Sequence, residues 1–173
     1  MENQELTKSK LQDSTLLVKM ILTAWDAQFS KIDKLFKSFS YEQLMNEVAP
    51  GRNRGIYLLG HQTAVTDGML PLLEFGDKLF PELQEVFIKN SDKSGLEMPS
   101  IEELKQKWDA VNKKLADHIE KMSTEEWFEK HTAVSDEEFQ HEPHRNKLNI
   151  IISRTNHQAY HIGQLVFLEK KAE

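Results

Sequence analysis

Apolar residues recur along this chain at the spacing of a helix rather than that of a strand. Neither Gly nor Pro occurs between Leu6 and Pro50, a span long enough for one long helix. Within this span, apolar residues repeat at alternating intervals of 4 and 3, which marks one face of a helix that must pack against other helices. The residues of this seam are Val18, Leu22, Trp25, Phe29, Ile32, Phe36 and Phe39.

Three further helices are predicted. The second runs from about Asn53 to Leu73, after the break at Pro50-Gly51, and the fourth begins near Asn146. The third begins after Ser100, because Ser100 followed three residues later by Glu103 is typical of a capping box. The seam of the third helix consists of Ile101, Leu104, Trp108, Val111 and Leu115.

Two long connections separate these helices. Residues 74–100 contain two glycines and two prolines, and we expect a crossing connection with one short helix at about Glu82 to Ile88. Residues 129–146 are expected to form a polar connection. Four long helices with two long connections predict an all-α four-helix bundle, and 173 residues suit one domain spanning 1–173.

The composition of the chain limits which classes of partner and which chemistry are expected. The chain carries 22 Lys and Arg against 28 Asp and Glu, a net charge of −6, which argues against nucleic acid because phosphate binding needs a basic face. Cysteine is absent, so any thiol chemistry needs a thiol from outside the chain.

The cellular location of the protein is predicted from two segments. Met1–Glu5 is acidic and lacks the pattern of a signal peptide, and the least charged long stretch, Gly55–Leu73, contains His61, Gln62 and Asp67 and falls short of a membrane span. We therefore expect a cytoplasmic protein with no membrane partner.

The candidate chemistry begins with His157 and His161, whose spacing of four places both imidazoles on one helix face. Such pairs also arise by chance among exposed or hydrogen-bonded surface residues. Here the flanking segments, Ile150–Ile152 and Leu165–Leu168, are those of a buried helix, where two polar rings need partners. A metal ion bound by both imidazoles would supply a partner for each of them.

His61 is the candidate third ligand, because it lies on the apolar stripe of the second helix. A single histidine there would more often be a core residue with a hydrogen-bond partner. Three histidines on inward faces of two helices favour a metal site, since bundle interiors build such sites from facing helices. Three imidazoles suit a divalent transition metal such as zinc or nickel, and leave positions for water or substrate.

Two segments carry a family resemblance. Residues 51–61 (GRNRGIYLLGH) and 156–165 (NHQAYHIGQL) resemble the two signatures of the DinB-like and YfiT-like metalloproteins, and the resemblance covers essentially the whole chain. It implies a four-helix bundle with a long crossover and a divalent metal held by His61, His157 and His161. The family includes metal-dependent hydrolases, and transferases and isomerases that use low-molecular-weight thiols such as bacillithiol or mycothiol.

Three further residues are candidates for the site. Arg154, one turn before His157, could project into the metal pocket and bind a carboxylate or phosphate, or could pair with an acidic residue. Gln164, one turn after His161, could accept from an imidazole N–H or be an ordinary polar residue. Tyr160 could donate to an oxygen at the ion or pack against the helices. The remaining histidines, expected to be packing or surface residues, are His118, His131, His141 and His144.

Two classes of function stay open. The first is a metal-dependent enzyme that activates water or an external thiol toward a small, anionic substrate, as a hydrolase or as a thiol-dependent transferase or isomerase. A general base is missing, because no Asp or Glu falls on the histidine stripes and Asp67 lies well off the face of His61. The second is a non-catalytic, stress-associated metal-binding bundle that acts through protein contacts and has a closed four-ligand site. A homodimer is compatible with either.

Overall fold

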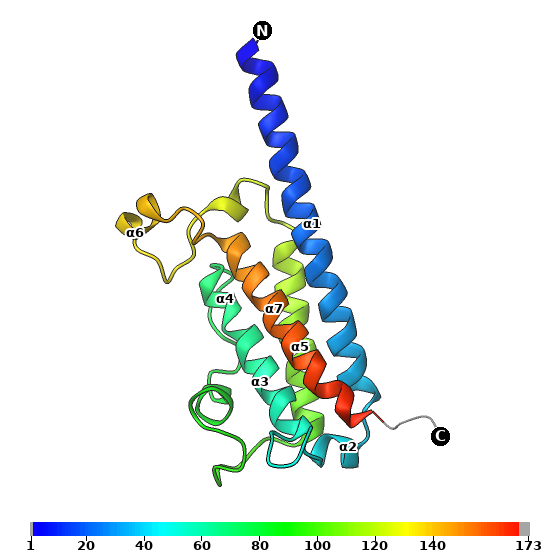
Figure 1. The fold of residues 1–173 in the computed structure, drawn as a ribbon. Helices are drawn as coiled ribbons and strands as arrows, with labels where there is room; N and C mark the ends of the chain where they lie inside the picture. Colours follow the sequence, from blue (N-terminus) through cyan, green and yellow to red (C-terminus); the bar gives the residue numbers. More distant parts are fainter. Residues whose placement is uncertain (1, 170–173) are drawn as a thin grey trace.

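Four long helices form the body of the molecule. The computed structural model describes residues 2–169, and the side chains of residues 10–169. The longest helices are α1 (Glu2–Ser38), α3 (Gly55–Asp67), α5 (Ile101–Ile119) and α7 (Lys147–Leu165). They lie side by side, α1 and α7 running in one direction and α3 and α5 in the other (Figure 1). Within residues 2–169 the chain contains no β-strand, only two isolated bridges, so the prediction of an all-helical bundle is confirmed.

The predicted seams fill the interior. On α1, Trp25, Ile32 and Phe36 are buried, and the α5 seam is buried along its whole length. These residues form two apolar clusters, one around Phe36 and Trp108 and one around Trp25. The N-terminal part of α1 extends beyond the other helices (Figure 1). No helix of the described chain is both long enough and apolar enough to cross a bilayer.

The first predicted helix is shorter than the absence of Gly and Pro suggested. It ends at Ser38, and a separate short helix, α2, spans Tyr41–Met45. Ser40 causes the break, because its hydroxyl accepts from the Gln43 backbone N–H while the Gln43 side chain accepts from the Ser40 backbone N–H. This capping box satisfies the first backbone donors of a new helix, and so competes with continuation of the old one.

The second predicted helix is also divided. It ends at Asp67, and one turn, α4 (Met69–Leu72), follows Gly68. Pro71 lacks the N–H that would bond to the Asp67 carbonyl, so the helix cannot continue unbroken. The buried Asp67 carboxylate accepts from the backbone N–H groups of Leu79 and Phe80, at 2.7 and 2.9 Å, and ties the following loop to the end of α3.

The connection between α4 and α5 lies along α3. Its short helix is a π-helical turn, η1 (Glu85–Lys89), close to the predicted Glu82 to Ile88. Asp92 anchors the segment by accepting from the Arg54 backbone N–H at 2.8 Å and from its guanidinium at 2.7 Å. The buried Phe87 ring consequently packs against Gly60 of α3.

The last connection contains more structure than predicted. Residues 129–146, expected to be a polar connection, include α6 (Asp136–His141). Ser135 and Glu138 form a capping box at its start, so this segment carries the same sequence signal as the start of α5 although the prediction of a polar connection does not use it. Two short 3₁₀ turns complete the described chain: η2 (Glu126–Phe128) precedes α6, and η3 (Val166–Leu168) directly follows α7.

Gly60→Ala is expected to destabilise the protein, because a Cβ at Gly60 would overlap the Phe87 ring, which is fully buried. Overpacking of this kind costs about 1–3 kcal/mol. Gly163→Ala is the matched control, since a Cβ on this glycine in the last turn of α7 meets nothing within 4 Å and the change should stabilise α7 by up to about 1 kcal/mol. Urea unfolding of both variants measures the difference, and equal effects would contradict the packing of Phe87 on α3.

Candidate metal centre

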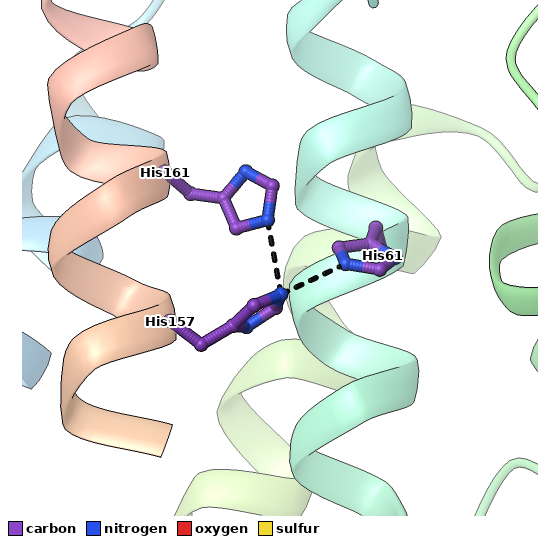
Figure 2. Close-up of side chains that lie close together, drawn as sticks. All are labelled: His61, His157 and His161. Atoms are coloured by element: carbon purple, nitrogen blue, oxygen red, sulfur yellow. Dashed lines mark hydrogen bonds between the residues drawn. The ribbon is translucent and has the colours of Figure 1, made fainter. Parts of the chain in front are cut away.

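Three imidazoles from two helices converge on one point. His61 comes from the middle of α3, and His157 and His161 come from successive turns of α7 (Figure 2). The Nε2 atom of His157 lies 3.2 Å from Nε2 of His61 and 3.1 Å from Nε2 of His161. The potential ligand atoms of all three residues lie within 4.8 Å of one another.

These separations suit a common metal ion. Two nitrogens bound to zinc at about 2.0–2.1 Å are about 3.4 Å apart when the angle at the ion is tetrahedral, and about 2.9 Å apart when it is a right angle. The observed 3.1 and 3.2 Å fall between these values. The three histidines could therefore hold one ion with little rearrangement.

The other ring nitrogen of two histidines is held by an acceptor. His61 Nδ1–H donates to the Phe87 carbonyl oxygen at 2.8 Å, and His161 Nδ1–H donates to Gln164 Oε1 at 2.7 Å. Each of these bonds fixes the tautomer that leaves the Nε2 lone pair free and points it at the common centre.

His157 is held differently. Its Nδ1 lies 3.2 Å from Nε2 of Gln62, so the Gln62 amide donates to Nδ1 and the His157 proton resides on Nε2. The His157 Nε2–H group therefore donates to the Nε2 lone pairs of both His61 and His161. For His157 to bind an ion through Nε2, its proton must move to Nδ1 and the Gln62 amide must turn to present its oxygen.

Burial keeps the three imidazoles neutral. It is the main cause that lowers the pKa of His157 and of His161 to about 4, and the neighbouring rings contribute to both shifts. The pKa of His61 is also lowered, first by burial and then by the positive charge of Arg154, against the opposing effect of the Phe87 carbonyl. Metal ligation requires neutral imidazoles, so none of the three has to lose a charge to bind an ion at neutral pH, although His157 still has to change its tautomer.

A cleft of about 530 Å³ opens beside the histidines. His61 and His157 line it, whereas His161 is buried behind them. Arg154 and Lys78 also line the cleft, and no Asp or Glu belongs to its lining. The volume is in the range of small-molecule sites.

The other predicted site residues take separate positions. Arg154 lies on the cleft wall, and Gln164 contacts His161 as described above. Tyr160 is 64% exposed and is not part of the cleft lining; its hydroxyl accepts from Gln164 Nε2 at 3.2 Å, and its ring meets His161 edge to face. It therefore neither packs in the core nor faces the cleft.

Two contributors were missed in the sequence. Gln62 follows His61 directly and is buried, but a glutamine beside a histidine carries no spacing signal of its own. The Phe87 carbonyl is a backbone group whose position depends on how the long connection packs. Of the other histidines, His118 stacks on Phe75 and His131 is buried in a loop, so neither joins the cluster.

Neither the family models nor the curated proteins contain a match to this chain.

Acid is expected to destabilise the metal-free protein over a defined interval. Histidines in the unfolded chain have an ordinary pKa of 6.5, whereas folded His157 and His161 have a pKa of about 4. Between these values the unfolded state binds more protons, so the free energy of unfolding should fall as pH drops from 6.5 toward 4.

Thermal unfolding in chelator between pH 8 and pH 5 measures this dependence. The double variant His157→Gln, His161→Gln is the control, because it keeps His131, whose pKa burial also lowers, but lacks the two strongly shifted rings. Its melting temperature should change less with pH than that of the native chain. Equal dependence in both proteins would contradict the low pKa values.

Proposed function

We propose that His61, His157 and His161 bind a divalent transition metal, zinc or nickel, and that the chain is a metal-dependent enzyme of the DinB-like and YfiT-like type. One observation carries the proposal: the three Nε2 atoms converge, with that of His157 lying 3.2 Å from that of His61 and 3.1 Å from that of His161. Two of the three rings also donate through Nδ1 to fixed acceptors, as metal-binding histidines do. The four-helix topology expected of that family fits the arrangement of α1, α3, α5 and α7 in Figure 1.

The open side of the cluster supports catalysis over a purely structural role. No fourth His, Asp or Glu joins the three histidines among the described residues, and the cleft reaches His61 and His157. When bound, such an ion lowers the pKa of a coordinated water or thiol and polarises a substrate carbonyl. The non-catalytic alternative requires a closed site with four protein ligands, for which the described chain offers three.

The residues around the cluster have distinct tasks in this proposal. Neutral imidazoles leave the ion its full charge, and the amides of Gln62 and Gln164 hold two of the rings in place. Tyr160 acts through Gln164 as a positioning residue. Because the cleft lining offers no carboxylate as a base, an external low-molecular-weight thiol is at least as well supported as water for the attacking group.

The test begins with metal content. The purified protein should carry, or take up, one zinc or nickel ion per chain, measured by elemental analysis and by calorimetric titration. The loaded protein is then screened with bacillithiol, mycothiol and other small thiols against electrophilic substrates, and with ester and amide substrates in water. A protein that binds neither metal would overturn the proposal, and a loaded protein with four protein ligands would favour the non-catalytic bundle.

Replacing a histidine ligand should reduce metal affinity far more than replacing the residue that hydrogen-bonds to that histidine. His161→Ala removes one of three direct bonds and is expected to reduce zinc affinity by orders of magnitude. Gln164→Ala removes only the acceptor of His161 Nδ1–H, and a loss of about 10- to 100-fold is typical of such partners. His144→Ala, at an exposed position outside the cluster, is the control and should bind zinc like the native chain. Calorimetric titration compares the three, and native-like zinc affinity in His161→Ala would contradict the ligand assignment.

Chelation should lower the melting temperature without unfolding the protein. The bundle core is independent of the ion, so helix content measured by circular dichroism should stay constant at 25 °C. Free zinc at 100 times its Kd stabilises the folded state by about 2.7 kcal/mol, a shift of several degrees for a chain of this size. Loss of helix content in chelator would make the ion structural and would count against a catalytic site.

A further inference from the structure

The cleft beside the histidines contains a cation that no side chain neutralises. The Nε atom of Arg154 is buried and has no hydrogen-bond partner, and none of the ion pairs among the described side chains includes Arg154. The other buried or half-buried arginines differ: Arg54 pairs with Asp92, and Arg145 pairs with Glu138 and Glu142. In a chain with 28 acidic residues, a half-buried guanidinium that pairs with none of them, and whose Nε has no partner, indicates a partner that comes from outside.

A second cation strengthens the positive potential of the cleft. Lys78 lines the same space, and its ammonium donates to the neutral Gln84 side chain rather than to a carboxylate. The lining contains one Arg and one Lys and no acidic side chain, although the chain as a whole carries a net charge of −6. A site of this composition attracts anions and repels cations.

The rest of the cleft wall is apolar. Val65 of α3, Leu72 of α4 and Ile88 of η1 line it, and Ile88 is 39% exposed. Exposed apolar surface next to an unpaired guanidinium suits a ligand with an anionic group at one end and a hydrocarbon body at the other. A fully hydrated polyanion would leave this wall unused.

We propose that the cleft binds a small organic monoanion with an apolar body. Its anionic group accepts hydrogen bonds from the Arg154 guanidinium, and its hydrocarbon part lies along Val65, Leu72 and Ile88. Arg154 precedes His157 by one helical turn, so a ligand anchored there lies beside the histidines. Only the role of this ligand as the substrate rests on the proposed function, and the binding of the anion does not.

The test measures binding of hexanesulfonate to the zinc-loaded protein by calorimetry. A sulfonate is chosen because a carboxylate could bind the ion directly and hide the contribution of Arg154. Hexanol is the uncharged comparison, and methanesulfonate is the comparison without a hydrocarbon body. Hexanesulfonate should bind more tightly than both, with methylene groups that contact the wall contributing about fourfold each.

Arg154→Met keeps the apolar stem and removes the charge. It should retain zinc and lose about 10- to 100-fold in hexanesulfonate affinity, as expected for a charged hydrogen bond, while hexanol binding stays the same. Arg154→Lys should recover part of that affinity. Arg52→Met, which removes a charge from an exposed loop, is the matched control and should bind hexanesulfonate like the native chain.

The outcomes separate this inference from the proposed function. Unchanged hexanesulfonate affinity in Arg154→Met, or equal binding of hexanesulfonate and hexanol, would overturn the anion site even if zinc binds. If the protein binds no zinc, the same titrations on the metal-free chain still decide the anion site. If Arg154→Met does not fold, the ¹⁵N-labelled native protein decides it, because the Arg154 Nε–H resonance must shift further with bound hexanesulfonate than with bound hexanol at the same occupancy, and equal shifts would overturn the anion site.

Discussion

Three imidazole lone pairs cannot face one another at 3.1 and 3.2 Å unless a proton or a cation lies between them. In this protein one proton, on His157 Nε2, satisfies the lone pairs of His61 and His161. The packing of α3 against α7 imposes that proximity, because His61 belongs to one helix and the other two histidines belong to the other (Figure 2). The proton in the centre therefore occupies the place that a metal ion would take.

The long connection before α5 is part of this arrangement. Its Phe87 carbonyl accepts from His61 Nδ1–H, so the tautomer of His61 depends on where that backbone lies. Two contacts hold it there: Asp92 pairs with Arg54 at the start of α3, and the Phe87 ring packs on Gly60. A segment that joins two helices thus also orients a candidate ligand, and supplies Lys78 and Ile88 to the cleft wall.

The helices that could be predicted from the sequence are those with a regular spacing of apolar residues or with a capping box at their start. The seams of α1 and α5 and the capping box at Ser100 are found as expected, because helical burial imposes regular spacing. The three histidines follow from their positions on inward faces. Two other features could not be predicted from the spacing of apolar residues. Ser40 ends α1 because it exchanges hydrogen bonds with Gln43 and starts a new helix. The Phe87 carbonyl accepts from His61 only because the long connection packs against α3. Gln62 has its role only because α7 places His157 opposite it.

Charge connects the histidine cluster to the cleft. A divalent ion held by three neutral imidazoles would keep its full charge, and Arg154 and Lys78 add two positive charges to the same space. Burial lowers the pKa of Arg154, which shows that its charge is poorly solvated there. Positive charges gathered in a partly dry cleft repel one another, and no carboxylate of the cleft lining compensates for them. A bound anion would remove that repulsion, so metal and anion should each strengthen the binding of the other.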